Sequence, residues 1–217
     1  MTAEHRFLTQ AGLDFAEEMM ASAMHELKNK LAIINENSGL IQDFSIMARQ
    51  SCPGLDLDRI EAISIKIQQQ IQSADTIIKK VNQFYQEMRT RPKAVDIEQS
   101  LTFVARLADR LLEKRGCQMH IEAPRSPVIV EFHPFYLQLV IWKMLDSISR
   151  SAGANCQVTV SPASIAESAS ITFKVDNGSM AHLDTILKTD EIKNLTRFLG
   201  IHLRLLEEPD AICVMLG

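Results

Sequence analysis

The sequence predicts an α+β protein built from a long helical hairpin followed by an α/β sandwich. Two long N-terminal segments carry apolar residues at steps of three and four, the spacing of amphipathic helices that pack into a bundle. The remainder alternates shorter helical patterns with short runs of alternating apolar and polar residues, which are typical of strands. Thr90-Arg91-Pro92 separates the two parts, because proline disfavours helical geometry in the residue before it. We therefore place one domain at 1–91 and a second at 92–217.

The composition is that of an ordinary globular protein and excludes several classes of function. Of the 217 residues, 46% are hydrophobic and 23% are charged, and the net charge of -4 gives no electrostatic case for a nucleic-acid or anionic-membrane partner. Neither a bilayer-spanning apolar run nor a signal-peptide pattern is present, so we expect a cytoplasmic protein. The four cysteines form no Cys-x-x-Cys pair, and the histidines have no metal-ligand spacing. We therefore expect no metal site.

The first helix is expected from near Asp14 to near Gln50, after a polar leader over residues 1–10. Glu17 and Glu18 lie in its early turns, where acidic side chains suit the helix dipole. The Ser-Cys-Pro-Gly cluster at 51–54 then makes a turn. The apolar seam of this helix consists of Met20, Met24, Leu27, Leu31 and Ile34.

A second helix over 56–90 has the same apolar spacing and is expected to run antiparallel to the first. One hairpin cannot bury such wide apolar stripes, whereas two hairpins can do so as a four-helix bundle. The sequence therefore predicts a homodimer with two-fold symmetry, held by a dimeric four-helix bundle. The alternative is that the stripes cover only the chain's own second domain.

The second domain is predicted as helices on one face of a mixed sheet. Asp96 begins its first helix, which Gly116 ends. Pro134 begins the next. The expected helices are 96–114, 134–150 and 183–199, and the expected strands are 118–122, 128–132, 157–160, 171–175, 201–206 and 211–216.

One stretch of the first helix, Met24 to Ala32, has the composition of a nucleophile site. If Met24 takes an a position of the heptad, His25 and Asn29 point away from the seam, one turn apart on the same face. Glu26 follows the histidine directly. An imidazole held outward on a rigid helix, with a carboxylate beside it and an amide one turn on, is suited to nucleophilic chemistry.

His-Glu-x-x-Asn within such a helix resembles the phosphoacceptor box of sensor histidine kinases and of dimeric histidine phosphotransferases. The resemblance implies that His25 is phosphorylated on a ring nitrogen, that Glu26 orients the ring and takes its proton, and that Asn29 positions a water for dephosphorylation of a partner. Lys30 stands where the family usually has proline. The helix therefore keeps its hydrogen bond there and should lack the usual bend.

The second domain is similar to the Bergerat fold that binds ATP in histidine kinases, but its nucleotide motifs are degraded. On this resemblance, Lys143 and Ser147 replace two asparagines that face phosphate and Mg²⁺, and serine lacks the reach and the carbonyl oxygen of an asparagine ligand. Asp176 and Gly178 fit the first glycine box, yet Met180 replaces its second glycine. No glycine lies between Ser179 and Gly200 to let a backbone wrap a triphosphate. We therefore treat Asp176 and Gly178 as vestigial, because the Asp-Asn-Gly sequence is favoured more simply as a turn than as a nucleotide site.

A retained acceptor box beside a degraded ATP site resembles a dimeric histidine phosphotransferase. The resemblance implies a phosphorelay in which His25 passes phosphoryl groups between receiver-domain aspartates, without a cofactor of its own and with Mg²⁺ supplied by the receiver. With so short a leader, we expect the chain to sense no signal itself. Two alternatives stay open: a non-catalytic pseudokinase that binds a response regulator or kinase, and a response-regulator phosphatase that uses Asn29. A residual kinase is a further rival that nucleotide titration would test.

The receiver is expected to dock on the outer face of the first helix below His25. Glu36 could pair with a basic partner residue, or be a solvated surface charge. Ile33 lies off the seam, where an outward apolar residue suits a partner helix or a contact with the second domain. The residues expected on this face are Lys28, Asn29, Ala32, Ile33 and Glu36.

Overall fold

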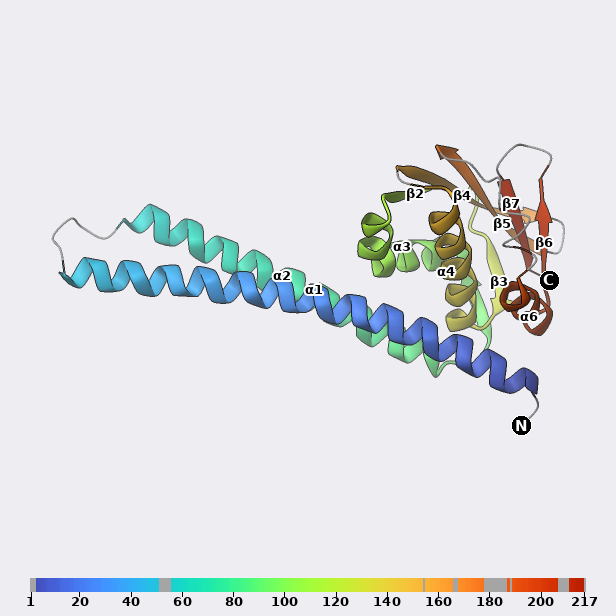
Figure 1. The fold of residues 1–217 in the computed structure, drawn as a ribbon, viewed down its shortest axis with the longest axis horizontal. Coiled ribbons are helices and arrows are strands. Elements are labelled where there is room, and N and C mark those ends of the chain that lie inside the picture. The colour runs from blue at the N-terminus through green and yellow to red at the C-terminus, as the bar shows by residue number, and fades with distance from the viewer. Residues whose placement is uncertain are drawn as a thin grey trace. The chain divides into compact units, whose positions relative to one another are not determined.

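The computed structural model confirms the α+β class, with a long helical hairpin followed by a mixed sheet and its helices (Figure 1). It describes residues 3–50, 56–153, 155–165, 168–177, 187, 189–206 and 211–216. The chain divides into two compact units, Met20–Tyr85 and a second unit that joins Met1–Met19 to Gln86–Gly217. The sequence instead sets its domain boundary at 91/92, after the second helix.

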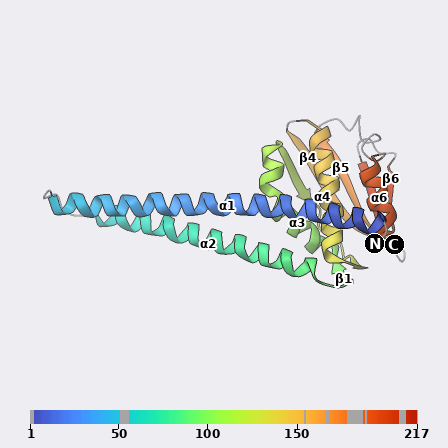
Figure 2. The same ribbon diagram turned by 60° about the horizontal axis from the view of Figure 1, so that its bottom comes forward.

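The hairpin unit contains most of α1 (Ala3–Gln50) and α2 (Leu57–Met88), which run side by side in both views (Figure 2). The guanidinium of Arg59 lies 4.4 Å from the ring centroid of Phe44, joining the start of α2 to the end of α1. Ile63 and Ile77 are buried on α2 at a spacing of two heptads. The first helix therefore meets the second along one stripe, as the periodicity predicts.

Part of the predicted seam is not covered within a single chain. Met24 and Leu31 are 47% and 54% exposed on α1, and Ile71 and Ile78 are 53% and 46% exposed on α2. On α1 the residues buried inside the hairpin include a small one, Ala23, and a polar one, the 9%-exposed Asn37. The homodimer that would cover these apolar residues stays a prediction.

The second unit is organised around a five-stranded sheet in the order β2-β4-β5-β7-β6. β2 and β4 are parallel, and their connection passes through α4, as a parallel neighbour requires. The other pairs are antiparallel. The strands are β2 (Cys117–Ile121), β4 (Cys156–Ile165), β5 (Ser168–Asn177), β6 (Ile201–Leu205) and β7 (Ala211–Leu216).

Among the described residues, three helices accompany this sheet: α3 (Ile97–Lys114), α4 (Pro134–Ser151) and α6 (Asp190–Leu199). Along β4, Val158 and Val160 are buried while Gln157 and Thr159 point to the more accessible face, the alternation of a strand with one covered face. Trp142 and much of α4 are completely buried. The core of the unit therefore lies between the helices and one face of the sheet.

The ends of the helices follow from local chemistry. The Asp96 carboxylate accepts hydrogen bonds from two backbone N–H groups of the first turn of α3, and Thr189 caps α6 in the same way. Gly200 ends α6 in the left-handed conformation, at φ 65°, which glycine adopts without a Cβ penalty.

The polar leader expected over residues 1–10 is helical from Ala3, as a helical lead-in would be, and the first turns of α1 belong to the second unit. Phe15 is 1% exposed, and its ring lies 5.5 Å from that of Phe135 on α4. A Cβ at Gly12 would lie 3.1 Å from the Phe135 ring, so the two helices approach closely there. These contacts with α4 therefore hold the first turns of α1 in the second unit.

Other departures concern strands. β1 (Lys93–Asp96) was not predicted, and it pairs with β3 (Ile129–Phe132) in a separate two-stranded sheet. β4 and β5 each have 10 residues, longer than predicted. The predicted helix over 183–199 is described as α6 in its second half, and residues 183–186 lie outside the described residues. Among the described helices, none combines the length and the apolar character needed to cross a bilayer.

Candidate functional site

His25 lies on an unbroken part of α1 with its side chain exposed. Asn29, one turn on, is exposed as well. The helix continues through Lys30 without interruption, as expected where no proline removes a backbone donor. The His25 side chain is therefore accessible to a partner that approaches the outer face of the helix.

The residues expected to dock a receiver share this face. Their positions fall three, four, seven, eight and eleven residues after His25, steps that return to the same side of a helix. Ile33 is 38% exposed. The exposed members are Lys28, Asn29, Ala32, Ile33 and Glu36.

Glu26 has a different environment from His25. Successive helical residues do not face each other, and Glu26 is half-buried where His25 is exposed. Within the described part of the chain, no hydrogen bond links the Glu26 carboxylate to the imidazole. Its role as orienter and base stays a prediction, since a side-chain rotation on receiver docking would be needed to bring the two groups together.

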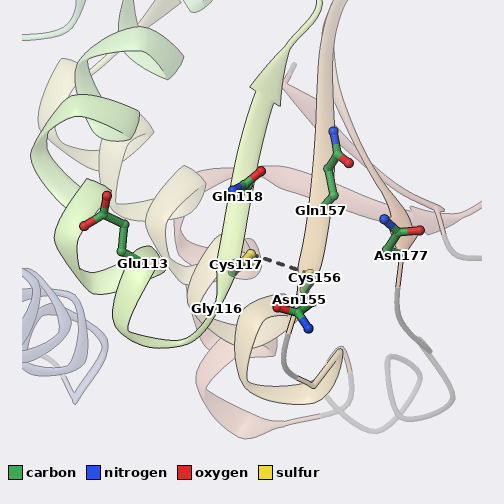
Figure 3. A pocket seen from close by; sticks show the side chains of 8 residues that line it. All are labelled: Glu113, Gly116, Cys117, Gln118, Asn155, Cys156, Gln157 and Asn177. Carbon is green, nitrogen blue, oxygen red and sulfur yellow. Dashed lines mark hydrogen bonds between the residues drawn. The ribbon is translucent and has the colours of Figure 1, made fainter.

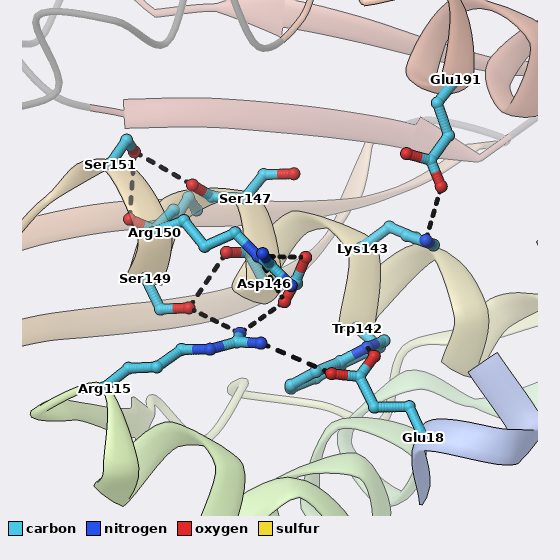
Figure 4. A network of polar contacts seen from close by, with 11 residues as sticks. Glu18, Arg115, Trp142, Lys143, Asp146, Ser147, Ser149, Arg150, Ser151 and Glu191 are labelled. Atoms are coloured by element: carbon cyan, nitrogen blue, oxygen red, sulfur yellow. Dashed lines mark hydrogen bonds and ion pairs between the residues drawn. The ribbon is translucent and has the colours of Figure 1, made fainter. Parts of the chain in front are cut away.

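The positions expected to face a nucleotide are engaged within the α/β unit (Figure 4). Lys143 Nζ lies 2.5 Å from Glu191 Oε1, joining α4 to the first turn of α6, and the lysine side chain is only 16% exposed. The backbone carbonyl of Ser147 accepts a hydrogen bond from the Ser151 hydroxyl at 3.0 Å. The cation that would meet a phosphate therefore already has a carboxylate partner.

Asp176 lies at a bulge, where the register of β5 against β4 shifts between Gln157 and Val158. Its Oδ2 accepts a hydrogen bond of 2.5 Å from the Thr159 hydroxyl. Gly178, the other vestigial residue, lies outside the described residues, as does Met180. In the described ranges no cluster of three or more His, Cys, Asp or Glu side chains could hold a metal ion.

A polar network that the sequence did not predict joins the start of α1 to α4 (Figure 4). Glu18 accepts hydrogen bonds from the Trp142 indole at 2.9 Å and from Arg115 Nη2 at 3.4 Å. Arg115 also donates to Ser149 at 3.1 Å and forms an ion pair with Asp146. Glu18, Arg115 and the residues of α4 are far apart in sequence, so no local motif predicts that they interact.

Comparison with known proteins gives matches only at the level of structure. No family model matches the sequence, and no curated protein does either. The histidine kinase AdeS of Acinetobacter baumannii is 12% identical, with a TM-score of 0.47 over 89% of this chain and 97% of that one. A mycobacterial sensor histidine kinase, MprB, is 15% identical with a TM-score of 0.44, over 58% of this chain and 97% of that one.

The ATP-binding domain of PrrB from Mycobacterium tuberculosis is 16% identical, with a TM-score of 0.46 over 58% of this chain and 95% of that one. The likeness is one of fold, and it assigns no activity or residue role to this chain.

Proposed function

We propose that the protein is a histidine phosphotransferase of a two-component phosphorelay, in which His25 carries phosphoryl groups between receiver-domain aspartates. The observation that carries the proposal is the exposed imidazole on an unbroken helix, with Asn29 one turn on. The order of elements in the α/β unit, which is the order that the resemblance to histidine kinases implies, supports a role in two-component signalling.

The reaction is a displacement at phosphorus. A ring nitrogen of neutral His25 attacks an aspartyl phosphate, and a P–N bond forms while the P–O bond to the aspartate breaks. The aspartate of a second receiver then attacks the phosphohistidine and regenerates the imidazole. The other ring nitrogen needs a hydrogen-bond partner to fix the tautomer, and we assign that role to Glu26. Mg²⁺ in the receiver's acidic pocket neutralises the phosphoryl oxygens.

The internal pairing of Lys143 supports the exclusion of ATP-dependent autophosphorylation. A nucleotide phosphate at this position would have to displace the Glu191 carboxylate or lie beside it, and either arrangement is electrostatically unfavourable. The phosphoryl group on His25 is therefore proposed to come from a receiver rather than from ATP.

The receiver is proposed to dock on the outer face of α1 below His25. Ile33, Leu40 and Met47 are 38%, 39% and 62% exposed at seven-residue intervals, so an apolar column continues from the predicted docking face. Lys28 and Glu36 flank the start of this column with charge of both signs. Such a surface suits the apolar face of a partner helix with a polar rim.

A second copy of the chain is proposed to cover the other apolar stripe of the hairpin. Ile71, Ile78 and Tyr85 are each about half exposed at seven-residue intervals on α2. Ile78→Lys should convert a dimer to a monomer in light scattering, whereas Thr76→Lys, at an exposed position on the opposite side of α2, should not. A monomeric wild type at micromolar concentration would contradict the four-helix bundle.

A non-catalytic receiver-binding pseudokinase is the second candidate, and the Lys143–Glu191 pair favours it equally. Variants separate the functions. His25→Ala should abolish transfer from a phosphorylated receiver, while His120→Ala, which removes another exposed histidine, should leave it intact. Transfer that survives in His25→Ala would refute the proposal. Binding without transfer in the wild type would favour the pseudokinase, and faster receiver dephosphorylation that is lost in Asn29→Ala would favour a phosphatase.

A further inference from the structure

Two buried cysteines meet at the edge of the sheet where β2 and β4 begin (Figure 3). Cys117 and Cys156 are 2% and 1% exposed, and the Cys117 thiol donates a hydrogen bond to the sulfur of Cys156 at 3.5 Å. Both line a hollow of about 280 Å³ that also contains Glu113 and four side-chain amides. Buried thiols serve most often as small apolar residues, so their placement decides whether they can do more.

We infer that Cys117 and Cys156 form a peroxide-sensitive thiol pair that closes to a disulfide between β2 and β4. The two residues are register partners on neighbouring parallel strands. Neighbouring strands lie about 4.8 Å apart, within the Cα separations of about 4.4–6.8 Å that disulfides span. The sulfurs must close from 3.5 Å to a bond of about 2.05 Å, which requires side-chain rotation and a small strand adjustment rather than rearrangement of the fold.

The hydrogen bond assigns different roles to the two thiols. Burial raises the pKa of both thiols, and for Cys117 burial together with its donated hydrogen bond raises the pKa to about 12. The same hydrogen bond lowers the pKa of Cys156 against the effect of burial, because it stabilises the Cys156 thiolate. Cys156 is therefore the thiol that attacks, and Cys117 is the one that resolves.

The steps balance with hydrogen peroxide as the oxidant. Cys156 first loses its thiol proton, and the thiolate then attacks one peroxide oxygen as the O–O bond breaks. Cys156 becomes a sulfenic acid, and the departing hydroxide takes up the proton that the thiol lost and leaves as water. The Cys117 sulfur then attacks the Cys156 sulfur, and a second water leaves as the S–S bond forms. Peroxide is close to water in size, so the hollow lined by both cysteines can admit it.

The cross-link would restrain the turn between α3 and β2, next to the Arg115 ion pairs. Cys117 follows Gly116, which has φ 67°, and Arg115, which pairs with Glu18 and Asp146. A bond at Cys117 would fix the end of the α3–β2 turn from which Arg115 extends. The oxidised protein is therefore expected to unfold at a higher temperature than the reduced protein, because the bond also restricts the unfolded chain.

The test is peroxide treatment of the folded full chain, followed by peptide mapping that identifies the state of every cysteine. The wild type should yield a Cys117–Cys156 cross-linked peptide lighter by two hydrogen atoms, and dithiothreitol should reverse it. Cys213→Ser removes another buried cysteine, on β7, and should still form the cross-link. Cys117→Ser should accumulate a dimedone-reactive sulfenic acid at Cys156, whereas Cys156→Ser should leave Cys117 as a thiol.

Three results would overturn the inference. One is a wild type whose Cys117 and Cys156 remain thiols while an added unfolded thiol peptide is fully oxidised. Another is cross-linking of either residue to a different cysteine in preference to its register partner. The third is sulfenic acid at Cys117 in the Cys156→Ser variant with none at Cys156 in the Cys117→Ser variant, which would reverse the assigned roles. The wild-type map needs no substitution, so it stays informative if a variant fails to fold.

Discussion

Replacement of Glu18 by alanine should destabilise the α/β unit through the loss of one buried hydrogen bond. Trp142 is 0% exposed, and its indole N–H donates to Glu18 at 2.9 Å. Without that acceptor the N–H stays buried and unpaired, which costs about 1–3 kcal/mol. Arg115 loses one contact of 3.4 Å but keeps Asp146, so the ion pair adds little. The expected loss of unfolding free energy is therefore about 1–3 kcal/mol, mostly from the indole.

The assay is thermal unfolding followed by tryptophan fluorescence. Trp142 is the chain's one tryptophan, so the signal reports this site directly. A loss of 1 kcal/mol lowers Tm by about 2–4 °C for a unit of this size, so Glu18→Ala should unfold several degrees below the wild type. Glu17→Ala removes the same charge from an exposed neighbour and should change Tm by a degree or less.

A double-mutant cycle isolates the hydrogen bond from the charge. Trp142→Phe removes both the donor and the chain's one tryptophan, so all four proteins of the cycle are followed by circular dichroism instead. Glu18→Ala should cost less in the Trp142→Phe background than in the wild type, with a coupling of about 1 kcal/mol. Glu18→Gln keeps a carbonyl acceptor for the indole, so its Tm should lie between those of Glu18→Ala and the wild type. If Glu18→Ala and Glu17→Ala unfold at the same temperature, the reasoning is refuted. The first turns of α1 would then lie outside the cooperatively unfolding unit.

Three further predictions concern other sites in the α/β unit. Asp96→Ala removes the N-cap of α3 and should cost about 0.5–2 kcal/mol in urea unfolding, whereas Asp109→Ala on the exposed face of α3 should cost almost nothing. Burial lowers the pKa of His133 below 6.5, so the unfolded chain takes up a proton at a higher pH than the folded chain, and stability should fall as pH drops below 6.5. His133→Gln should remove that part of the pH dependence of stability. An unchanged pH dependence in this variant would contradict the prediction. Glu191→Gln leaves Lys143 without its carboxylate partner, so phosphate should bind Lys143 more readily and raise the Tm of this variant more than that of the wild type. Equal Tm shifts in the two proteins would show that Lys143 does not bind anions.

Periodicity was sufficient to predict the elements whose pattern is local. The end of α1, both ends of α2, and helices α3 and α4 lie close to their predicted bounds, because apolar spacing, the Asp96 cap and Pro134 are all visible in sequence. The first turns of α1 precede the start predicted near Asp14, and the close approach of Gly12 to Phe135 is a contact that no window of sequence contains. β1 was missed because a four-residue strand carries too little alternation to be distinguished from a linker.

In the candidate site, too, the features set by local spacing were predicted and those set by tertiary packing were not. The helical repeat alone places His25 and Asn29 on one face, and both are exposed. The partners of Lys143 and Glu18 could not be foreseen, since Glu191 and Trp142 reach them only through the fold. Spacing places side chains on a face, whereas ion pairs between elements depend on how the elements pack.

The most direct test of the central claim is an acid-labile phosphohistidine assay on wild type and His25→Ala. Each protein is incubated first with radiolabelled ATP and Mg²⁺ alone, and then with a receiver domain carrying labelled aspartyl phosphate. The account predicts no label from ATP, label from the receiver, and no label from either source in His25→Ala. Label from ATP alone would contradict the account of the α/β unit, and the absence of label from a receiver that binds would contradict phosphotransfer through His25.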